Sequence, residues 1–149
     1  MKREELLRRL APCGLNCGKC VAFAGGPVQE HAQALAGLLG DNFASYAERF
    51  TPMQPEFAGY PVFRTVLDLL SRGDCTGCRG QGCLFQACEV TRCVREQGVD
   101  FCFECAEFPC DRHGMPEPLA ARWQANNERM KMIGVEAFHN NIREKPRYP

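Results

Sequence analysis

Cysteine spacing constrains this chain more than any other feature of its sequence. Eleven of the 149 residues are cysteine, and nearly all of them stand a few residues from another cysteine. Residues 13–20 read C-x3-C-x2-C, and a C-x2-C-x4-C pattern occurs twice, at 75–83 and 102–110. Thiolates at such spacings can meet at one Zn²⁺ ion or at an iron–sulfur cluster. The sequence therefore predicts a metal-binding protein.

The N-terminus and the hydropathy pattern bear on where such a chain would reside. Its first residues are highly charged and lack the apolar segment of a secretory signal. No run approaches the roughly 18 consecutive apolar residues of a membrane span. We therefore expect a cytoplasmic protein with no membrane partner. In a reducing compartment, cysteine clusters bind metal or do redox chemistry rather than form disulfides.

Between the cysteine clusters, apolar residues recur at helical spacing. The segments 28–39, 43–50, 63–70 and 89–97 each fit an amphipathic helix, and 119–142 fits another that is interrupted at Gly134. The period-2 alternation of strands is hard to find. We predict one mainly α-helical domain over 1–149 with little or no β-sheet. Its Cys-rich, zinc-knuckle-like loops would be 11–22 and 74–113, and its helical parts 27–72 and 117–145.

Ten cysteines form the predicted set of metal ligands, which would hold two or three Zn²⁺ ions. They are Cys13, Cys17, Cys20, Cys75, Cys78, Cys88, Cys93, Cys102, Cys105 and Cys110. Because short loops are the least costly to close, we expect the four cysteines from Cys75 to Cys93, without Cys83, to share one ion. A second ion would use Cys102, Cys105 and Cys110, completed by an N-terminal cysteine or by His113. The roles of Cys83 and His113 stay open.

The chain resembles a bacterial and archaeal Cys-rich family, domain of unknown function 3795. The resemblance rests on A-P-C-G-L-N-C at 11–17 with Cys20, on D-C-T-G-C at 74–78, and on Cys88, R-C at 92–93 and Gly98. It continues with F-C-F-E-C-A-E-F-P-C at 101–110, and so covers about residues 11–112. It implies a small zinc-binding protein and implies no activity. Cys83 is the cysteine that fits the family pattern least, and Asn16 stands where aspartate is frequent.

Three functions agree with these observations to different degrees. A structural zinc protein that serves as a binding or regulatory module is favoured, because closed four-thiolate sites are inert and nothing else in the sequence indicates turnover. An iron–sulfur protein for electron transfer or oxygen sensing is the alternative. Nucleic-acid binding is disfavoured, because the formal net charge is zero. An unidentified protein partner and the oligomeric state remain open, and catalysis is not indicated.

Overall fold

The chain divides into two compact units. The computed structural model describes residues 1–148. Val21–Asp74 form one unit, which we call the hairpin unit, and Met1–Cys20 together with the chain from Cys75 onward form the other, which we call the cysteine unit. All eleven cysteines belong to the cysteine unit. The prediction of one domain over 1–149 stays a prediction.

Helices make up nearly all of the regular structure. Residues 1–148 contain seven α-helices and three short 3-10 helices, and no strand apart from an isolated β-bridge between Leu10 and Asn16. The prediction of a mainly α fold with little or no β-sheet is therefore confirmed. No helix among these residues is long and apolar enough to cross a membrane.

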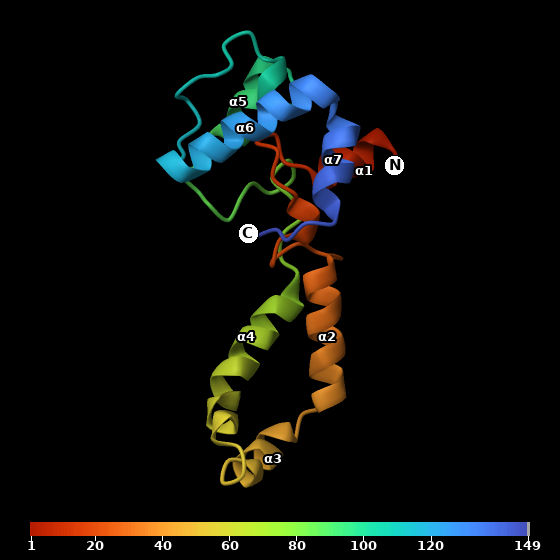
Figure 1. Ribbon diagram of the computed structural model, residues 1–149, viewed down its shortest axis with the longest axis vertical. Helices are drawn as coiled ribbons and strands as arrows, with labels where there is room; N and C mark the ends of the chain where they lie inside the picture. Colours follow the sequence, from red (N-terminus) through yellow and green to blue (C-terminus); the bar gives the residue numbers. More distant parts are fainter. Residues whose placement is uncertain (149) are drawn as a thin grey trace. The chain divides into compact units, whose positions relative to one another are not determined.

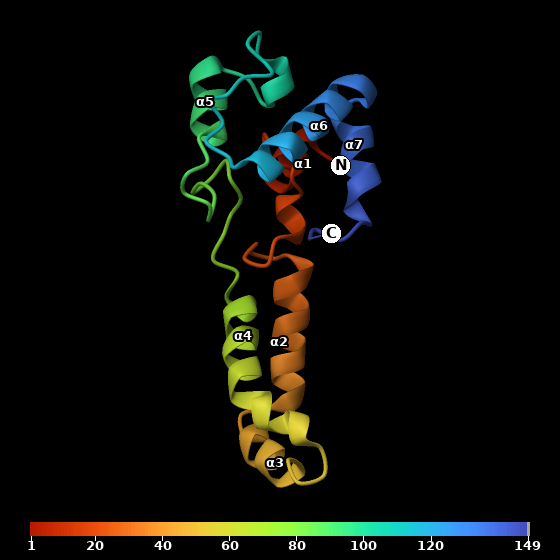
Figure 2. The same ribbon diagram turned by 60° about the vertical axis from the view of Figure 1, so that its left-hand side comes forward.

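The hairpin unit is built on two helices that lie side by side, α2 (Pro27–Leu39) and α4 (Tyr60–Arg72) (Figure 1; Figure 2). The helix α3 (Phe43–Phe50) and a 3-10 helix (Pro55–Gly59) connect them. The side-chain amides of Gln29 and Gln33 donate to the carbonyl of Ser71, at 3.2 and 2.9 Å. These bonds satisfy a last-turn carbonyl that the helix itself leaves unpaired, and so attach the end of α4 to α2.

The cysteine unit has its own apolar core. This core consists of Leu10, Phe101, Met130 and Phe138. Leu10 directly follows α1 (Arg3–Arg9), and Phe101 directly precedes a 3-10 helix (Cys102–Glu104). Met130 lies in α6 (Glu117–Ile133) and Phe138 in α7 (Val135–Arg143). The remaining helices of this unit are α5 (Val90–Gln97) and a 3-10 helix (Cys17–Lys19). This core supports the segments that carry the cysteines.

The structure confirms the predicted helices, with two differences at particular residues. α4 begins at Tyr60, inside the expected loop, because Pro61 lies in the first turn, where proline is tolerated. The helix α1 was not predicted, although its Leu6 and the following Leu10 are buried. The predicted interruption at Gly134 is confirmed, because this residue, at φ 83°, separates α6 from α7.

Candidate metal centres

Four cysteines line one small cavity in the cysteine unit, which we call the four-cysteine pocket. Cys93 comes from α5, and Cys102, Cys105 and Cys110 come from the following segment. The cavity measures about 20 Å³, and the aromatic rings of Phe108 and Trp123 form part of its wall. A space for one water-sized sphere needs about 10–15 Å³. The pocket therefore has room for a single ion among four thiols.

The turn that carries Cys102 and Cys105 is held by Glu104. The carboxylate of Glu104 accepts hydrogen bonds from the backbone N–H groups of Asp100 and Phe101, at 2.8 and 3.0 Å. The N–H of Cys105 donates to the carbonyl of Cys102 at 3.0 Å, which closes the 3-10 turn. Burial, and to a smaller extent the neighbouring thiolates of Cys93 and Cys110, raise the pKa of Cys102 to about 11. A cation bound in this pocket would instead lower the pKa of Cys102, because a positive charge stabilises thiolates.

The other seven cysteines line a larger cavity, which we call the seven-cysteine cavity. It measures about 270 Å³, and its cysteines are Cys13, Cys17, Cys20, Cys75, Cys78, Cys83 and Cys88. Its wall is otherwise mostly apolar, with Leu84, Phe85, Val90, Met115 and Leu119, and it also includes Arg122 and Arg147. This cavity therefore combines many soft ligands with two cationic side chains.

One pair of thiols in the larger cavity already stands at the spacing of ligands on one ion. The Sγ atoms of Cys17 and Cys78 are 3.7 Å apart. Two thiolates at about 2.3 Å from one tetrahedral zinc ion are roughly 3.8 Å apart. The thiol of Cys78 interacts with Cys17 and Cys83, which lowers the pKa of Cys17 to about 7 and that of Cys83 to about 6, and raises the pKa of Cys78. The hydrogen bonds of Cys78 therefore favour the thiolate forms of Cys17 and Cys83.

Backbone N–H groups point at two other sulfurs of this cavity. Gly77 donates to the Sγ of Cys75 at 3.3 Å, and Phe85 donates to the Sγ of Cys83 at 3.4 Å. Such bonds stabilise a thiolate, as they do around bound metals. Cys13 is different, because burial is complete enough to raise its pKa to about 12. Cys13 lies near Cys102 as well as Cys17, so it stands between the two groups.

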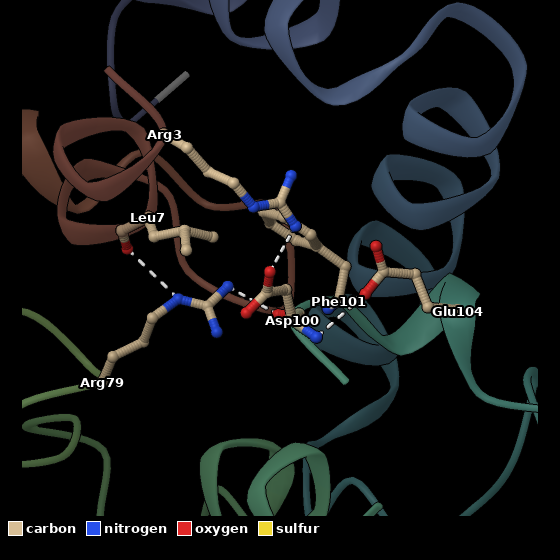
Figure 3. Close-up of polar contacts among 6 residues, drawn as sticks. All are labelled: Arg3, Leu7, Arg79, Asp100, Phe101 and Glu104. Atoms are coloured by element: carbon tan, nitrogen blue, oxygen red, sulfur yellow. Dashed lines mark hydrogen bonds and ion pairs between the residues drawn. The ribbon is translucent and has the colours of Figure 1, made fainter. Parts of the chain in front are cut away.

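Arg79 connects the loop of Cys78 to the segment that precedes Cys102 (Figure 3). Its guanidinium donates to the carbonyl of Leu7 at 3.1 Å and to the carbonyl of Asp100 at 2.5 Å, and lies 5.0 Å from the ring centre of Phe101. The carboxylate of Asp100 also pairs with Arg3 of α1. Arg79 therefore positions both cysteine groups relative to α1.

Asn127 of α6 makes a second connection between cysteine segments. The side chain is fully buried. Its Oδ1 accepts from the N–H of Phe103 at 3.0 Å, and its Nδ2 donates to the carbonyls of Pro12 and Trp123, at 3.3 and 3.0 Å. Pro12 directly precedes Cys13, and Phe103 stands between Cys102 and Cys105. Asn127 was not among the predicted site residues, because no ligand-type spacing marks it in the sequence.

The structure divides the cysteines differently from the expected grouping. Cys93 lies with Cys102, Cys105 and Cys110, and not with the cysteines that precede α5. The reason is that Cys88 precedes this helix whereas Cys93 lies within it, so the two line different cavities. His113 lines neither cavity. Its Nδ1 accepts from the N–H of Met115 at 3.0 Å, and its ring packs 4.9 Å from that of Trp123.

The ligand side chains decide which metals would suit the two cavities. All eleven cysteines are free thiols. Among residues 1–148, no three cysteine, histidine, aspartate or glutamate side chains are arranged to hold one ion. The donor set in both cavities is nevertheless all sulfur, which suits Zn²⁺ and iron–sulfur clusters and does not suit Mg²⁺ or Ca²⁺. The ten predicted ligands remain a prediction, and Cys83 lines the larger cavity with six of them.

One family model matches most of this chain. Residues 9–115 match the family described as "Protein of unknown function (DUF3795)". The chain belongs to this family. The matched segment includes all eleven cysteines and ends before α6, so the DUF3795 region contains every thiol of both cavities. Neither a curated protein nor a solved structure matches the chain significantly.

Proposed function

We propose that this protein binds zinc through its cysteines and that the metal is mainly structural, stabilising a module that binds or regulates a partner. The observation that supports this best is the four-cysteine pocket, where four thiols surround a space of single-ion size. Zinc with four thiolate ligands has no open position for substrate. Such a centre stabilises a fold and does not turn over.

The energetics support a structural role. Binding of structural zinc to a four-ligand site is worth about 10–16 kcal/mol in small peptides, which is as large as the whole stability of a typical domain. The segment around Cys75 to Cys88 contains little helix and few buried side chains. Metal would supply the folding free energy that this segment does not obtain from packing.

An iron–sulfur cluster in the seven-cysteine cavity is the second candidate. The observation that favours it is the excess of ligands, because seven cysteines and about 270 Å³ exceed what one zinc ion requires. Clusters of two or four irons take four thiolates and are larger than an ion. In that case the protein would carry electrons or sense oxygen, whereas the four-cysteine pocket would still hold zinc.

Metal analysis of protein purified without air tests both proposals. We expect two or three zinc ions per chain, and no visible absorption. Cys105→Ser should remove about one equivalent of zinc from the four-cysteine pocket. Cys75→Ser, its counterpart in the other cavity, should leave that equivalent bound.

Three results distinguish the candidates. Less than one zinc per chain, with no iron, contradicts metal binding as a whole. Iron with equimolar acid-labile sulfide and a brown colour, lost in Cys75→Ser and retained in Cys105→Ser, establishes the cluster in the larger cavity. An unchanged zinc content in Cys105→Ser contradicts the four-cysteine pocket.

A further inference from the structure

The chain after α7 returns to the first cysteine segment (Figure 1; Figure 2). Residues 144–148 follow α7 directly and contain neither helix nor strand. We call them the strap. The ammonium group of Lys19, the residue before Cys20, donates to the carbonyls of Arg143 and Lys145, both at 2.8 Å. These carbonyls lie 124 and 126 residues further along the chain, so the two bonds attach the strap to a segment that carries cysteines.

The strap forms part of the wall of the seven-cysteine cavity. Arg147 and Tyr148 both line this cavity. The phenol O–H of Tyr148 donates to the Sγ of Cys20 at 3.5 Å, and the guanidinium of Arg147 lies 5.2 Å from the centre of the tyrosine ring. The strap therefore covers the cavity beside Cys20.

Arg147 brings positive charge to this wall. Among the described residues that line the cavity, Arg122 and Arg147 are the charged ones, and none is a carboxylate. The Nε of Arg147 is buried and has no hydrogen-bond partner within residues 1–148. A buried N–H is costly until it finds an acceptor, and a thiolate in the cavity is an acceptor of opposite charge. Because four thiolates around one Zn²⁺ carry a net charge of about −2, metal in the cavity would strengthen this attraction.

The strap is only loosely packed against the rest of its unit. Four of its five residues are exposed, and Arg147 is half-buried. A second cavity, of about 210 Å³, separates residues 145–147 from residues 14–16 and from Arg122 and Asn126 of α6. Segments with few buried apolar contacts and exposed hydrogen bonds open locally more readily than a core does. The strap is therefore the part of the cavity wall that opens at the lowest cost.

We propose that the strap closes the seven-cysteine cavity and controls access to its thiols, and thereby the rate at which the cavity exchanges metal. The statement about metal exchange rests on the proposed function. In the open state, Cys20 is accessible to thiol reagents and to chelators. When opening and closing are fast compared with the reaction, the reaction rate follows the population of the open state. The four-cysteine pocket is a control within the same molecule, because no strap residue lines it.

Alkylation of the metal-loaded full chain, quantified for each cysteine by mass spectrometry, tests the strap. Lys19→Met removes both hydrogen bonds of the ammonium group and keeps a side chain of similar length. Cys20 should then react at least about fivefold faster than in wild type, because hydrogen bonds from a charged group hold the strap closed. Cys105 of the four-cysteine pocket should react at an unchanged rate. Lys131→Met, the same substitution at an exposed lysine of α6, should change neither rate.

Arg147→Gln is the second variant, and it tests the strap even where Lys19→Met does not fold, because Arg147 belongs to no helix. It should also speed the alkylation of Cys20, and it should speed the transfer of metal from the seven-cysteine cavity to a coloured chelator. Raising the ionic strength should speed this transfer in wild type and have a smaller effect in Arg147→Gln. Salt screens the attraction between Arg147 and the thiolates, which the variant lacks.

Two results overturn the proposal. One is a Cys20 that reacts as fast in the folded wild-type protein as in urea, and the other is an unchanged rate at Cys20 in both variants. Metal content separates these results from the fate of the proposed function. Faster alkylation of Cys20 in variants of a protein with less than one metal ion per chain supports the closing strap and contradicts metal binding. An unchanged rate with two or three zinc ions bound overturns the strap and leaves metal binding intact.

Discussion

Replacing Asn127 by alanine tests whether the buried amide holds the cysteine segments together. In Asn127→Ala, the N–H of Phe103 and the carbonyl of Pro12 lose their side-chain partner. A buried polar group without a partner costs about 1–3 kcal/mol. Pro12 is fully buried, whereas the bond from Phe103 is only partly buried, so we take the lower half of the range for the latter. The expected loss is about 2–5 kcal/mol in the free energy of unfolding, a large part of a typical domain's stability.

Trp123 gives a direct assay of this loss. It is the single tryptophan, it is buried, and its ring packs 5.1 Å from Phe108 beside the four-cysteine pocket. Urea denaturation at fixed free zinc, followed by its fluorescence, yields the change in unfolding free energy. Zinc affinity should fall as well, about 10–100-fold, because Asn127 orients the turn of Cys102 and Cys105 from outside the ligand set.

The matched control is Gln124→Ala on the same helix. Gln124 is exposed, and its amide donates to the carboxylate of Glu128, four residues along the helix. Loss of such a pair costs about 0.2–0.5 kcal/mol. If Asn127→Ala costs no more than Gln124→Ala, the reasoning about the buried amide is refuted.

Three further perturbations test other parts of the cysteine unit and the hairpin unit. Gly14→Ala should destabilise the protein by about 1–3 kcal/mol or more, because φ is 78° and the new Cβ would lie 2.5 Å from Cβ of Asn126. Its control, Gly37→Ala in open space on α2, should stabilise the protein by about 0.5–1 kcal/mol in the same urea assay. Burial, and then the charges of Arg9 and Arg143, lower the pKa of His139 below its ordinary value of 6.5. The unfolded chain therefore binds the proton more readily than the folded chain. The free energy of unfolding should fall as the pH drops from 6.5 through the folded pKa, by at most about 1.4 kcal/mol per pH unit. His139→Phe should remove this part of the pH dependence at constant free zinc. Strong chelation at neutral pH should expose the backbone of residues 74–112 to hydrogen exchange, and unchanged exchange after verified metal removal would make the centres peripheral to folding.

The helices were predictable from local signals. Pro27 and Gly40 bound α2, and Gly98, at φ 67°, closes α5, so residues close in sequence specify both ends. The helix α1 has an equally local signal in Leu6 and Leu10, which a helical periodicity test of the N-terminus would have found.

Asn127 could not be predicted in the same way. Asparagine in the middle of a helix is unfavourable by propensity and gives no sign of its environment. Asn127 contributes through hydrogen bonds to Pro12, 115 residues away, and to Phe103, 24 residues away. Only the packing of α6 against both cysteine segments brings these partners together. A buried polar side chain of this kind is a property of tertiary structure, so a single sequence does not reveal it.

The grouping of the cysteines was predicted from loop closure, whereas the cavities place Cys93 apart from Cys75, Cys78 and Cys88, and the magnitude of the loop effect shows how packing can do this. The expected group joined Cys78 to Cys93, 15 residues along the chain, whereas the structure brings Cys78 to Cys17, 61 residues away. Each doubling of a flexible loop costs only about 0.6 kcal/mol, so this fourfold difference amounts to about 1.2 kcal/mol. Burial of one large apolar side chain contributes about 1.5–3 kcal/mol. Leu10, buried three residues before Cys13, and Phe101, buried one residue before Cys102, share one core, so packing outweighs loop length in deciding which thiols meet.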